Sequence, residues 1–184
     1  TASEWSEAER IAEAVRSSSV AMRRLDGARF EVPLVWDEAG LRCSTSGVDI
    51  LCQNGDVADL KTCPTTFPPA WQAHAFRMLY PMQLAWYRRG ARANGIQTRG
   101  LFVLGVERRP PHEVVELELT EEMIEFADRT IDLWLSKLRT YMAACPEPQT
   151  VYDWPGYAEA PVKWRPPTWA DGDVAEIEDE EEAA

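Results

Sequence analysis

Hydrophobic and polar residues follow one another along this chain with two periods, one helical and one extended. Apolar positions three and four residues apart predict helices, at residues 4–25, 70–90 and 121–142. Runs of β-branched and aromatic residues between turn signals predict strands, at residues 30–36, 41–52, 56–63, 100–108 and 112–120. The order helix, three strands, helix, two strands, helix predicts an α/β fold with a mixed central β-sheet flanked by helices.

Individual residues sharpen several of these boundaries. The serines of Ser17–Ser19 weaken the middle of the first helical segment. Pro33 assigns the first strand to a sheet edge or a bulge, because proline cannot donate to a central ladder. Pro81 predicts a kink or restart in the second helical segment, and Gly90 predicts its end. Thr120 is a good N-cap for the last helix.

Length and charge predict how the chain is divided. A chain of 184 residues, 45% hydrophobic, predicts one domain with a substantial core. We assign that domain to residues 1–145 and expect the Pro- and Trp-rich segment 146–170 to pack on it. Eight acidic residues lie in 171–182, so the rest of the chain carries −4 of the net charge of −12. Residues 171–184 are therefore predicted to be a disordered acidic tail. The charge of the rest of the chain neither favours nor excludes a nucleic-acid partner.

The cysteines and the lengths of the apolar runs indicate the cellular compartment of the protein. The four cysteines, Cys43, Cys52, Cys63 and Cys145, form no close pair, so we expect reduced thiols, buried where they fall in strands, rather than a disulfide or metal site. No run approaches the ~18 apolar residues of a membrane span, and no charged-then-apolar signal opens the chain. These features predict a cytoplasmic protein with no membrane partner. Since the first residue is Thr1, the chain is expected to be a fragment or a processed form.

The segment GVDILCQNGDVADLKTC, residues 47–63, places charged side chains inside an apolar hairpin. Asp49, Asp59 and Lys61 interrupt its apolar runs, although each is costly to remove from water. In one interpretation the aspartates lie solvated at strand ends and the lysine extends its stem to reach water. The other interpretation depends on how the hairpin turns.

Two hairpin registers lead to different arrangements of these side chains. A two-residue turn at Asn54–Gly55 sets Asp49 opposite Leu60, so that the two aspartates project from opposite faces. A three-residue loop, with the glycine in the left-handed position of a G1 bulge, instead pairs Asp49 with Asp59. In that register the two Cβ atoms lie about 4.5–5.5 Å apart on one face.

Two carboxylates this close repel each other among apolar neighbours, and a divalent cation removes the conflict. Aspartate oxygens, a nearby backbone carbonyl and several waters are the ligands that Mg²⁺ accepts. Lys61, on the same face, would then hold a metal-activated water or stabilise the charge that builds on a phosphate during attack. The bulged register therefore predicts a metal site suited to phosphate chemistry.

These residues resemble the signature of the PD-(D/E)XK nuclease superfamily. Asp49 followed by the DLK of residues 59–61 matches it, with Val48 at the position of the signature's proline. Gln83 and Tyr87 resemble the Q-x-x-x-Y motif of the RecB-like branch.

Further motifs are similar to the exonuclease VIII (RecE-like) group of phage and prophage nucleases. They are E-x-x-x-x-W from Glu31 to Trp36, the sequence WPGY, and a closing P-x-W. The similarity spans roughly residues 20–170.

The resemblance implies a restriction-endonuclease-like core and a Mg²⁺-dependent deoxyribonuclease, with Mn²⁺ as a substitute ion. Such an enzyme digests linear double-stranded DNA from its ends during recombination or phage DNA processing. The implied residues are Asp49, Asp59, Leu60 (through its carbonyl) and Glu31 as metal ligands, Lys61 with Asp49 and Asp59 in catalysis, and Gln83 and Tyr87 in DNA binding. A single-strand annealing protein and a homo-oligomeric ring around DNA are the implied partners.

Two alternatives use the same scaffold. One is a non-catalytic nucleic-acid-binding or assembly module, and the other is an endonuclease. The presence of Asp49, Asp59 and Lys61 together favours an enzyme, because a degenerate module is expected to have lost one of them. The family's upstream histidine near the metal has no counterpart here, since His74 and His112 both follow the hairpin.

Overall fold

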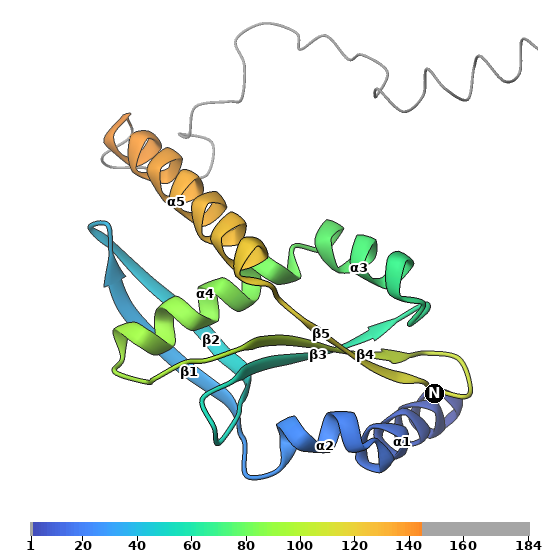
Figure 1. Ribbon diagram of the computed structural model, residues 1–184. Coiled ribbons are helices and arrows are strands. Elements are labelled where there is room, and N and C mark those ends of the chain that lie inside the picture. Colours follow the sequence, from blue (N-terminus) through green and yellow to red (C-terminus); the bar gives the residue numbers. More distant parts are fainter. Residues whose placement is uncertain (1, 145–184) are drawn as a thin grey trace, which may run out of the picture. The chain divides into compact units, whose positions relative to one another are not determined.

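The computed structural model describes residues 2–144, arranged around a five-stranded sheet (Figure 1). The helices are α1 (Ala2–Ser17), α2 (Ser19–Leu25), α3 (Pro68–Arg77), α4 (Tyr80–Ala93) and α5 (Glu121–Ala144). The strands are β1 (Arg29–Glu38), β2 (Leu41–Leu51), β3 (Val57–Cys63), β4 (Leu101–Glu107) and β5 (Val114–Glu118). Residues up to Thr140 form one compact unit. The predictions for Cys145, segment 146–170 and tail 171–184 lie outside the described residues.

The sheet has the order β1-β2-β3-β4-β5 and is mixed, as predicted. Only β3 and β4 run parallel, and the other neighbours are antiparallel. A parallel pair needs a long crossover, which α3 and α4 supply. In Figure 1, α1 and α2 lie on one side of the sheet and α3, α4 and α5 on the other. Each side has its own apolar cluster against the sheet, so the strands are covered on both faces.

The first helical segment and the first strand follow the sequence signals. The helix breaks at Ser18, whose side chain caps α2 by accepting from the Ala21 amide at 3.4 Å. β1 is an outer strand of the sheet, and its register shifts between Val32 and Leu34. The prediction that Pro33 marks an edge or a bulge is confirmed.

The second helical segment is two helices, and one of its predicted boundaries is wrong. Leu79 is left-handed, with φ 60°, and Pro81 lies in the first turn of α4, so the predicted restart is confirmed. Gly90 does not end α4, which continues to Ala93. A Cβ at Gly90 would lie 2.8 Å from the Trp36 ring, so this glycine permits close packing of α4 on β1 rather than a helix stop.

The remaining local predictions agree with the structure. The Thr120 hydroxyl accepts from the Met123 amide at 3.2 Å and caps the start of α5. Cys43, Cys52 and Cys63 are buried free thiols.

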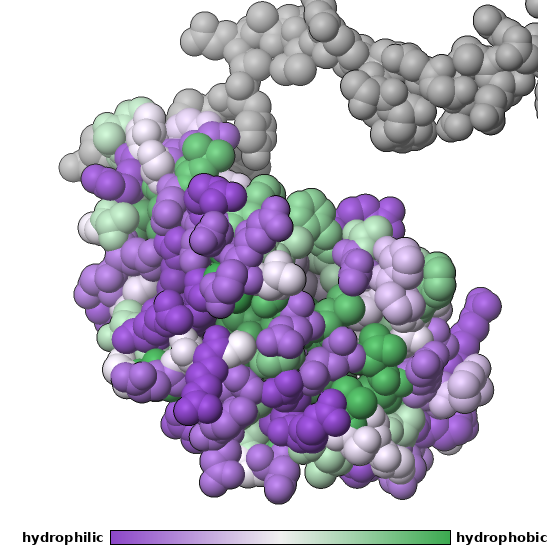
Figure 2. Space-filling model, viewed as in Figure 1, coloured by the Kyte–Doolittle hydropathy of each residue, from purple (hydrophilic) through white to green (hydrophobic). Residues whose placement is uncertain are grey.

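Among the described residues, no helix is long and apolar enough to cross a membrane. The face seen in Figure 2 is mostly hydrophilic, with apolar side chains in small groups.

Candidate active site

The β2–β3 hairpin adopts the three-residue loop. Leu51 pairs with Val57, which is the register that this loop requires and the two-residue turn does not allow. Gly55 has φ +88°, the left-handed conformation expected at the last position of the loop. The predicted register is therefore confirmed for the two residue pairs of this ladder, and Asp49 and Asp59 are the next residues beyond it.

A buried carboxylate next to the loop holds it in this form. Asp56 accepts hydrogen bonds from Arg24 Nη1 at 2.5 Å, Asn54 Nδ2 at 2.7 Å and the Gly100 amide at 2.9 Å. One side chain thus joins α2, the hairpin loop and the start of β4. Arg24 in turn makes a two-pronged contact with Glu116 of β5, at 2.7 and 3.0 Å. These contacts fix the length of the loop and, through it, the pairing of the two strands.

The two aspartates and the lysine meet on the face of the sheet covered by α3 and α4. Lys61 Nζ lies 2.6 Å from Asp59 Oδ2 and 3.7 Å from Asp49 Oδ2. Asp59 has no exposed surface, whereas the side chains of Lys61 and Asp49 are 22% and 29% exposed. The site therefore has a dry floor at Asp59 and a side open to solvent at Asp49 and Lys61.

Burial gives the two carboxylates different proton affinities. It raises the pKa of Asp59 to about 7, and the neighbouring Asp49 adds to this while Lys61 opposes it. Burial also acts to raise the pKa of Asp49, but hydrogen bonds with Asp59 and Tyr87 and the charge of Lys61 outweigh it, so that pKa is lowered. Below neutral pH the pair therefore holds one proton, on Asp59.

The donor set fits a hard divalent cation. Both oxygens of Asp59 are buried without a hydrogen-bond partner, although Oδ2 lies within ion-pair distance of Lys61. Two neighbouring carboxylates share this one ammonium, and a buried negative charge is costly unless cations balance it. Two protein carboxylates suit Mg²⁺, which usually keeps several waters.

Residues of α4 orient the more exposed aspartate and the lysine. The Tyr87 hydroxyl donates to Asp49 Oδ1 at 2.9 Å, and Gln83 Nε2 donates to the Tyr87 oxygen at 2.7 Å. Burial raises the pKa of Tyr87, so its hydroxyl stays a donor. Lys61 Nζ lies 5.3 Å from the centroid of the Tyr80 ring, a cation–π contact. The helical spacing brings Gln83 and Tyr87 together as predicted, and places Tyr80 one turn earlier.

Glu31 lies in β1 between Phe30 and Val32, which pair with Ile50 and Val48 on either side of Asp49. Glu31 is exposed and left-handed, with φ 50°, and its Oε2 lies 2.5 Å from where a Cβ on Gly47 would stand. Within residues 2–144, no three His, Cys, Asp or Glu side chains converge on a metal position. The proposed ligand set in this structure is therefore the two aspartates, with the Leu60 carbonyl between Asp59 and Lys61 in β3. The role of Glu31 as a ligand stays a prediction.

The two histidines make other contacts. His74 stacks on Trp71 at 5.6 Å between ring centroids. His112 is buried, with Nδ1 2.9 Å from the Glu107 carbonyl oxygen. His74 also meets the Tyr80 ring edge-on, at 6.3 Å between ring centroids.

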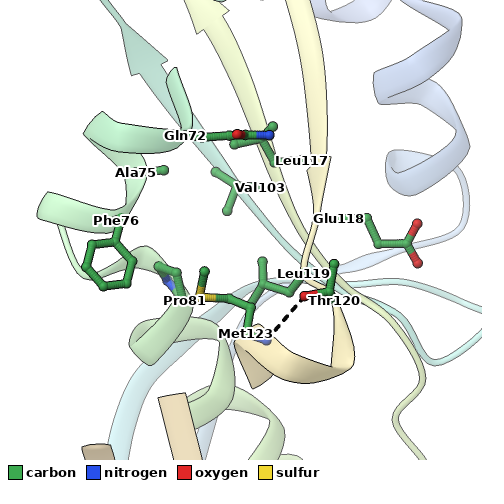
Figure 3. Close-up of a pocket in the computed structure, with 10 residues that line it drawn as sticks. All are labelled: Gln72, Ala75, Phe76, Pro81, Val103, Leu117, Glu118, Leu119, Thr120 and Met123. Atoms are coloured by element: carbon green, nitrogen blue, oxygen red, sulfur yellow. Dashed lines mark hydrogen bonds between the residues drawn. The ribbon is translucent and has the colours of Figure 1, made fainter. Parts of the chain in front are cut away.

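A separate apolar cavity of about 240 Å³ lies on the same side of the sheet (Figure 3). Its walls come from α3, the start of α4, β4, β5 and the start of α5. Val103, which lines it, pairs with Asp59 across β3 and β4. In Figure 3 the Glu118 carboxylate is turned away from the apolar side chains. The cavity therefore lacks the converging polar groups of the hairpin site.

Paired carboxylates and a lysine on the central hairpin of a mixed α/β sheet are the features of a PD-(D/E)XK-like domain. The chain belongs to the family described as PDDEXK-like domain of unknown function (DUF3799), whose model matches residues 1–152. A search of curated proteins finds no match.

Two solved structures are similar to this chain. One is described as "Putative exonuclease" from Eubacterium rectale, with TM-score 0.62 and 14% identity, covering 92% of this chain and 65% of that one. The chain thus spans less than two thirds of the length of that protein, and at this identity the likeness shows the fold, which is restriction-endonuclease-like. The other, SSO0001, has TM-score 0.36 and 17% identity over 70% of this chain and 67% of that one, and carries no argument.

Proposed function

We propose that this protein is a divalent-metal-dependent deoxyribonuclease that digests linear double-stranded DNA from its ends. Membership of a PDDEXK-like family supports a nuclease. The observation that carries the proposal is the fully buried carboxylate of Asp59 beside that of Asp49, with one ammonium, that of Lys61, shared between them. Mg²⁺ is the proposed ion, and Mn²⁺ its substitute.

Each residue of the site has a distinct role in this proposal. Asp49, Asp59 and the Leu60 carbonyl would hold the ion, which supplies a Lewis acid and an activated water when bound. Asp59 gives up its proton to become a ligand, and Lys61 offsets the negative charge of the reacting phosphate. Gln83 and Tyr87 hold Asp49 in place and would contact the DNA backbone.

Two parts of the proposal are more specific than nuclease activity: digestion from DNA ends, and the partners of the protein. They rest on the resemblance of the E-x-x-x-x-W, WPGY and P-x-W motifs to RecE-like exonucleases. A single-strand annealing protein and a homo-oligomeric ring belong to the same proposal. No contact among the described residues argues for a second function.

The test compares end-labelled linear duplex with covalently closed circular duplex, each with Mg²⁺ or EDTA. We expect Mg²⁺-dependent loss of the linear DNA, an intact circle, and no digestion by Lys61→Ala. Cleavage of the circle would contradict the exonuclease proposal and would favour an endonuclease, because the circle has no ends. Equal behaviour of wild type and Lys61→Ala would leave a non-catalytic module as the remaining alternative.

A further inference from the structure

The hairpin loop forms one wall of a polar pocket of about 560 Å³ at the end of the sheet. The start of β1 and the loop before β4 form the other walls. The side chains that matter here are Arg29, Gln53, Asn54, Gln97, Thr98 and Arg99. This pocket is separate from the aspartate site and from the apolar cavity.

The pocket is positive in an acidic protein. The chain has 31 acidic and 19 basic residues, yet no Asp or Glu lines this pocket. Within the part of the chain that the structure describes, Arg29 and Arg99 make no ion pair. Thr98, which lines the pocket, accepts a hydrogen bond from Arg92 Nε at 2.8 Å. The adjoining carboxylate of Asp56 is already bound to Arg24.

Other arginines of the fold differ from this group. Arg24, Arg88 and Arg89 are each bound by carboxylates and serve to join elements. Arg29 and Arg99 are exposed and lie on opposite walls of one pocket. Their charge is therefore available to an anion from outside the chain.

The walls of the pocket are held before any ligand arrives. The Arg99 amide donates to the Gly55 carbonyl at 2.9 Å, which joins the hairpin to the opposite loop. A Cβ at Gly55 would lie 2.6 Å from the Gln97 carbonyl oxygen, so the two loops approach closely only because this residue is glycine. A preorganised site of this kind loses little entropy on binding.

The pocket lies just beyond the end of β2, the strand that carries Asp49. Gln53 follows Asp49 by four residues, or roughly 13 Å at the rise of an extended strand. Phosphates of one DNA strand recur about every 3.4 Å along the helix axis. A duplex whose reacting phosphate lies at Asp49 would therefore present further phosphates at the pocket.

We propose that this pocket binds a backbone phosphate of DNA a few nucleotides from the reacting phosphate. Guanidinium groups suit phosphate oxygens because they donate in pairs. The amide side chains of Gln53 and Gln97 add neutral donors. The inference rests on the proposed function for its choice of ligand, and it explains how an acidic protein would hold a polyanion.

The test is the salt dependence of binding to a fluorescent 20-base-pair duplex in EDTA, where no cleavage occurs. For Arg29→Ala/Arg99→Ala we expect about tenfold weaker binding and a slope of log K against log salt smaller by about 0.9 for each phosphate that the pocket no longer neutralises. The matched control is Arg10→Ala/Arg109→Ala, which removes the same charge from exposed arginines elsewhere. We expect it to leave the slope unchanged.

Two results would overturn the inference. One is an unchanged slope in the pocket variant, and the other is an equal fall in slope in both double variants. Unchanged melting temperatures of both variants show that folding does not account for the difference. The nuclease proposal is judged separately by Mg²⁺- and Lys61-dependent digestion, so a protein that binds DNA through the pocket without cutting it would keep this inference and lose the other.

Discussion

The ammonium of Lys61 lies 2.6 Å from Oδ2 of Asp59, a carboxylate with no exposed surface. Burial raises the pKa of Asp59 to about 7, although Lys61 opposes this shift. Between about pH 4 and 7 the metal-free protein therefore keeps a proton on Asp59 that an unfolded chain would release. Stability, pH and metal binding are linked through that proton.

We expect the free energy of unfolding in EDTA to fall as the pH rises from about 4 to 8. An unfolded Asp has a pKa near ~3.9, whereas burial raises the pKa of folded Asp59 to about 7. The folded state binds the extra proton in this window, so its advantage is present at low pH and is lost as pH rises through 7. Asp49 has a lowered pKa in the folded state, so the stability that it contributes is lost only as the pH falls below the unfolded value. Urea titrations measure the slope, up to about 1.4 kcal/mol per pH unit.

Asp59→Asn should stabilise the metal-free protein at pH 8. The amide is neutral and can donate to Asp49, as the protonated acid does, so the cost of burying a charge disappears. We expect a gain on the order of 1–3 kcal/mol at pH 8 and a flat pH profile between 5 and 8. The same variant should lose the Mg²⁺-dependent gain in melting temperature of the wild type. A less stable variant at pH 8 would contradict this account of Asp59.

Tyr87→Phe should reduce nuclease activity while the fold is retained. It removes the hydroxyl that donates to Asp49, and residues that orient a metal ligand are typically worth about 10–100-fold in activity or affinity. The loss of one hydrogen bond costs only about 1 kcal/mol of stability.

Trp86→Phe is a matched control for Tyr87→Phe, because it removes a donor on the same helix that bonds to the Ser44 carbonyl. Initial rates on end-labelled DNA compare the two variants. Equal rates in the two variants would show that the Tyr87 hydroxyl has no specific role in the nuclease activity.

Asp56→Ala should loosen the hairpin register. Without Asp56 the three-residue loop loses its links to Arg24, Asn54 and Gly100, and repulsion between Asp49 and Asp59 then favours the two-residue turn. Cross-strand NOEs report the change, because Leu51 faces Val57 in the native register and Ala58 in the slipped one. We expect Mg²⁺ binding to weaken with it, and a native NOE pattern would refute the idea.

Asp128→Ala separates a register effect from simple destabilisation. It removes carboxylate contacts from Arg88 and Arg89, far along the chain from the hairpin. We expect lower stability with an unchanged hairpin. If Asp56→Ala is too unstable to study, Asp56→Asn removes the charge and keeps an acceptor.

The hairpin site was predictable because its signals are local. The glycine after Asn54 limits the hairpin to two common registers, and the alternation of strand side chains gives the positions of Asp49 and Asp59 in each. The contacts of Asp56, which the sequence does not reveal, hold the three-residue loop. The spacing of Gln83 and Tyr87 likewise predicts their contact on one helix face.

Contacts between distant segments were not predictable from these patterns. Arg24 meets Asp56 across 32 residues, and Gly90 meets Trp36 only after α4 packs on β1. The left-handed backbone of Glu31, beside the irregular part of β1, and the contact of its side chain with Gly47 were likewise not signalled by its motif, and its role as a metal ligand stays a prediction. Such outcomes depend on packing geometry that a single stretch of sequence does not encode.

β3 is the middle strand of the sheet, and it carries both Asp59 and Lys61. All seven residues of β3 pair with β4, and only Val57 and Ala58 also pair with β2, whereas β1 and β5 each have one side free of the sheet. Exchange with deuterium at the outer strands can proceed through local opening, but exchange in β3 requires its ladder with β4 to open beneath the helices that cover both faces. β3, which carries Asp59 and Lys61, should therefore exchange with solvent more slowly than β1 and β5.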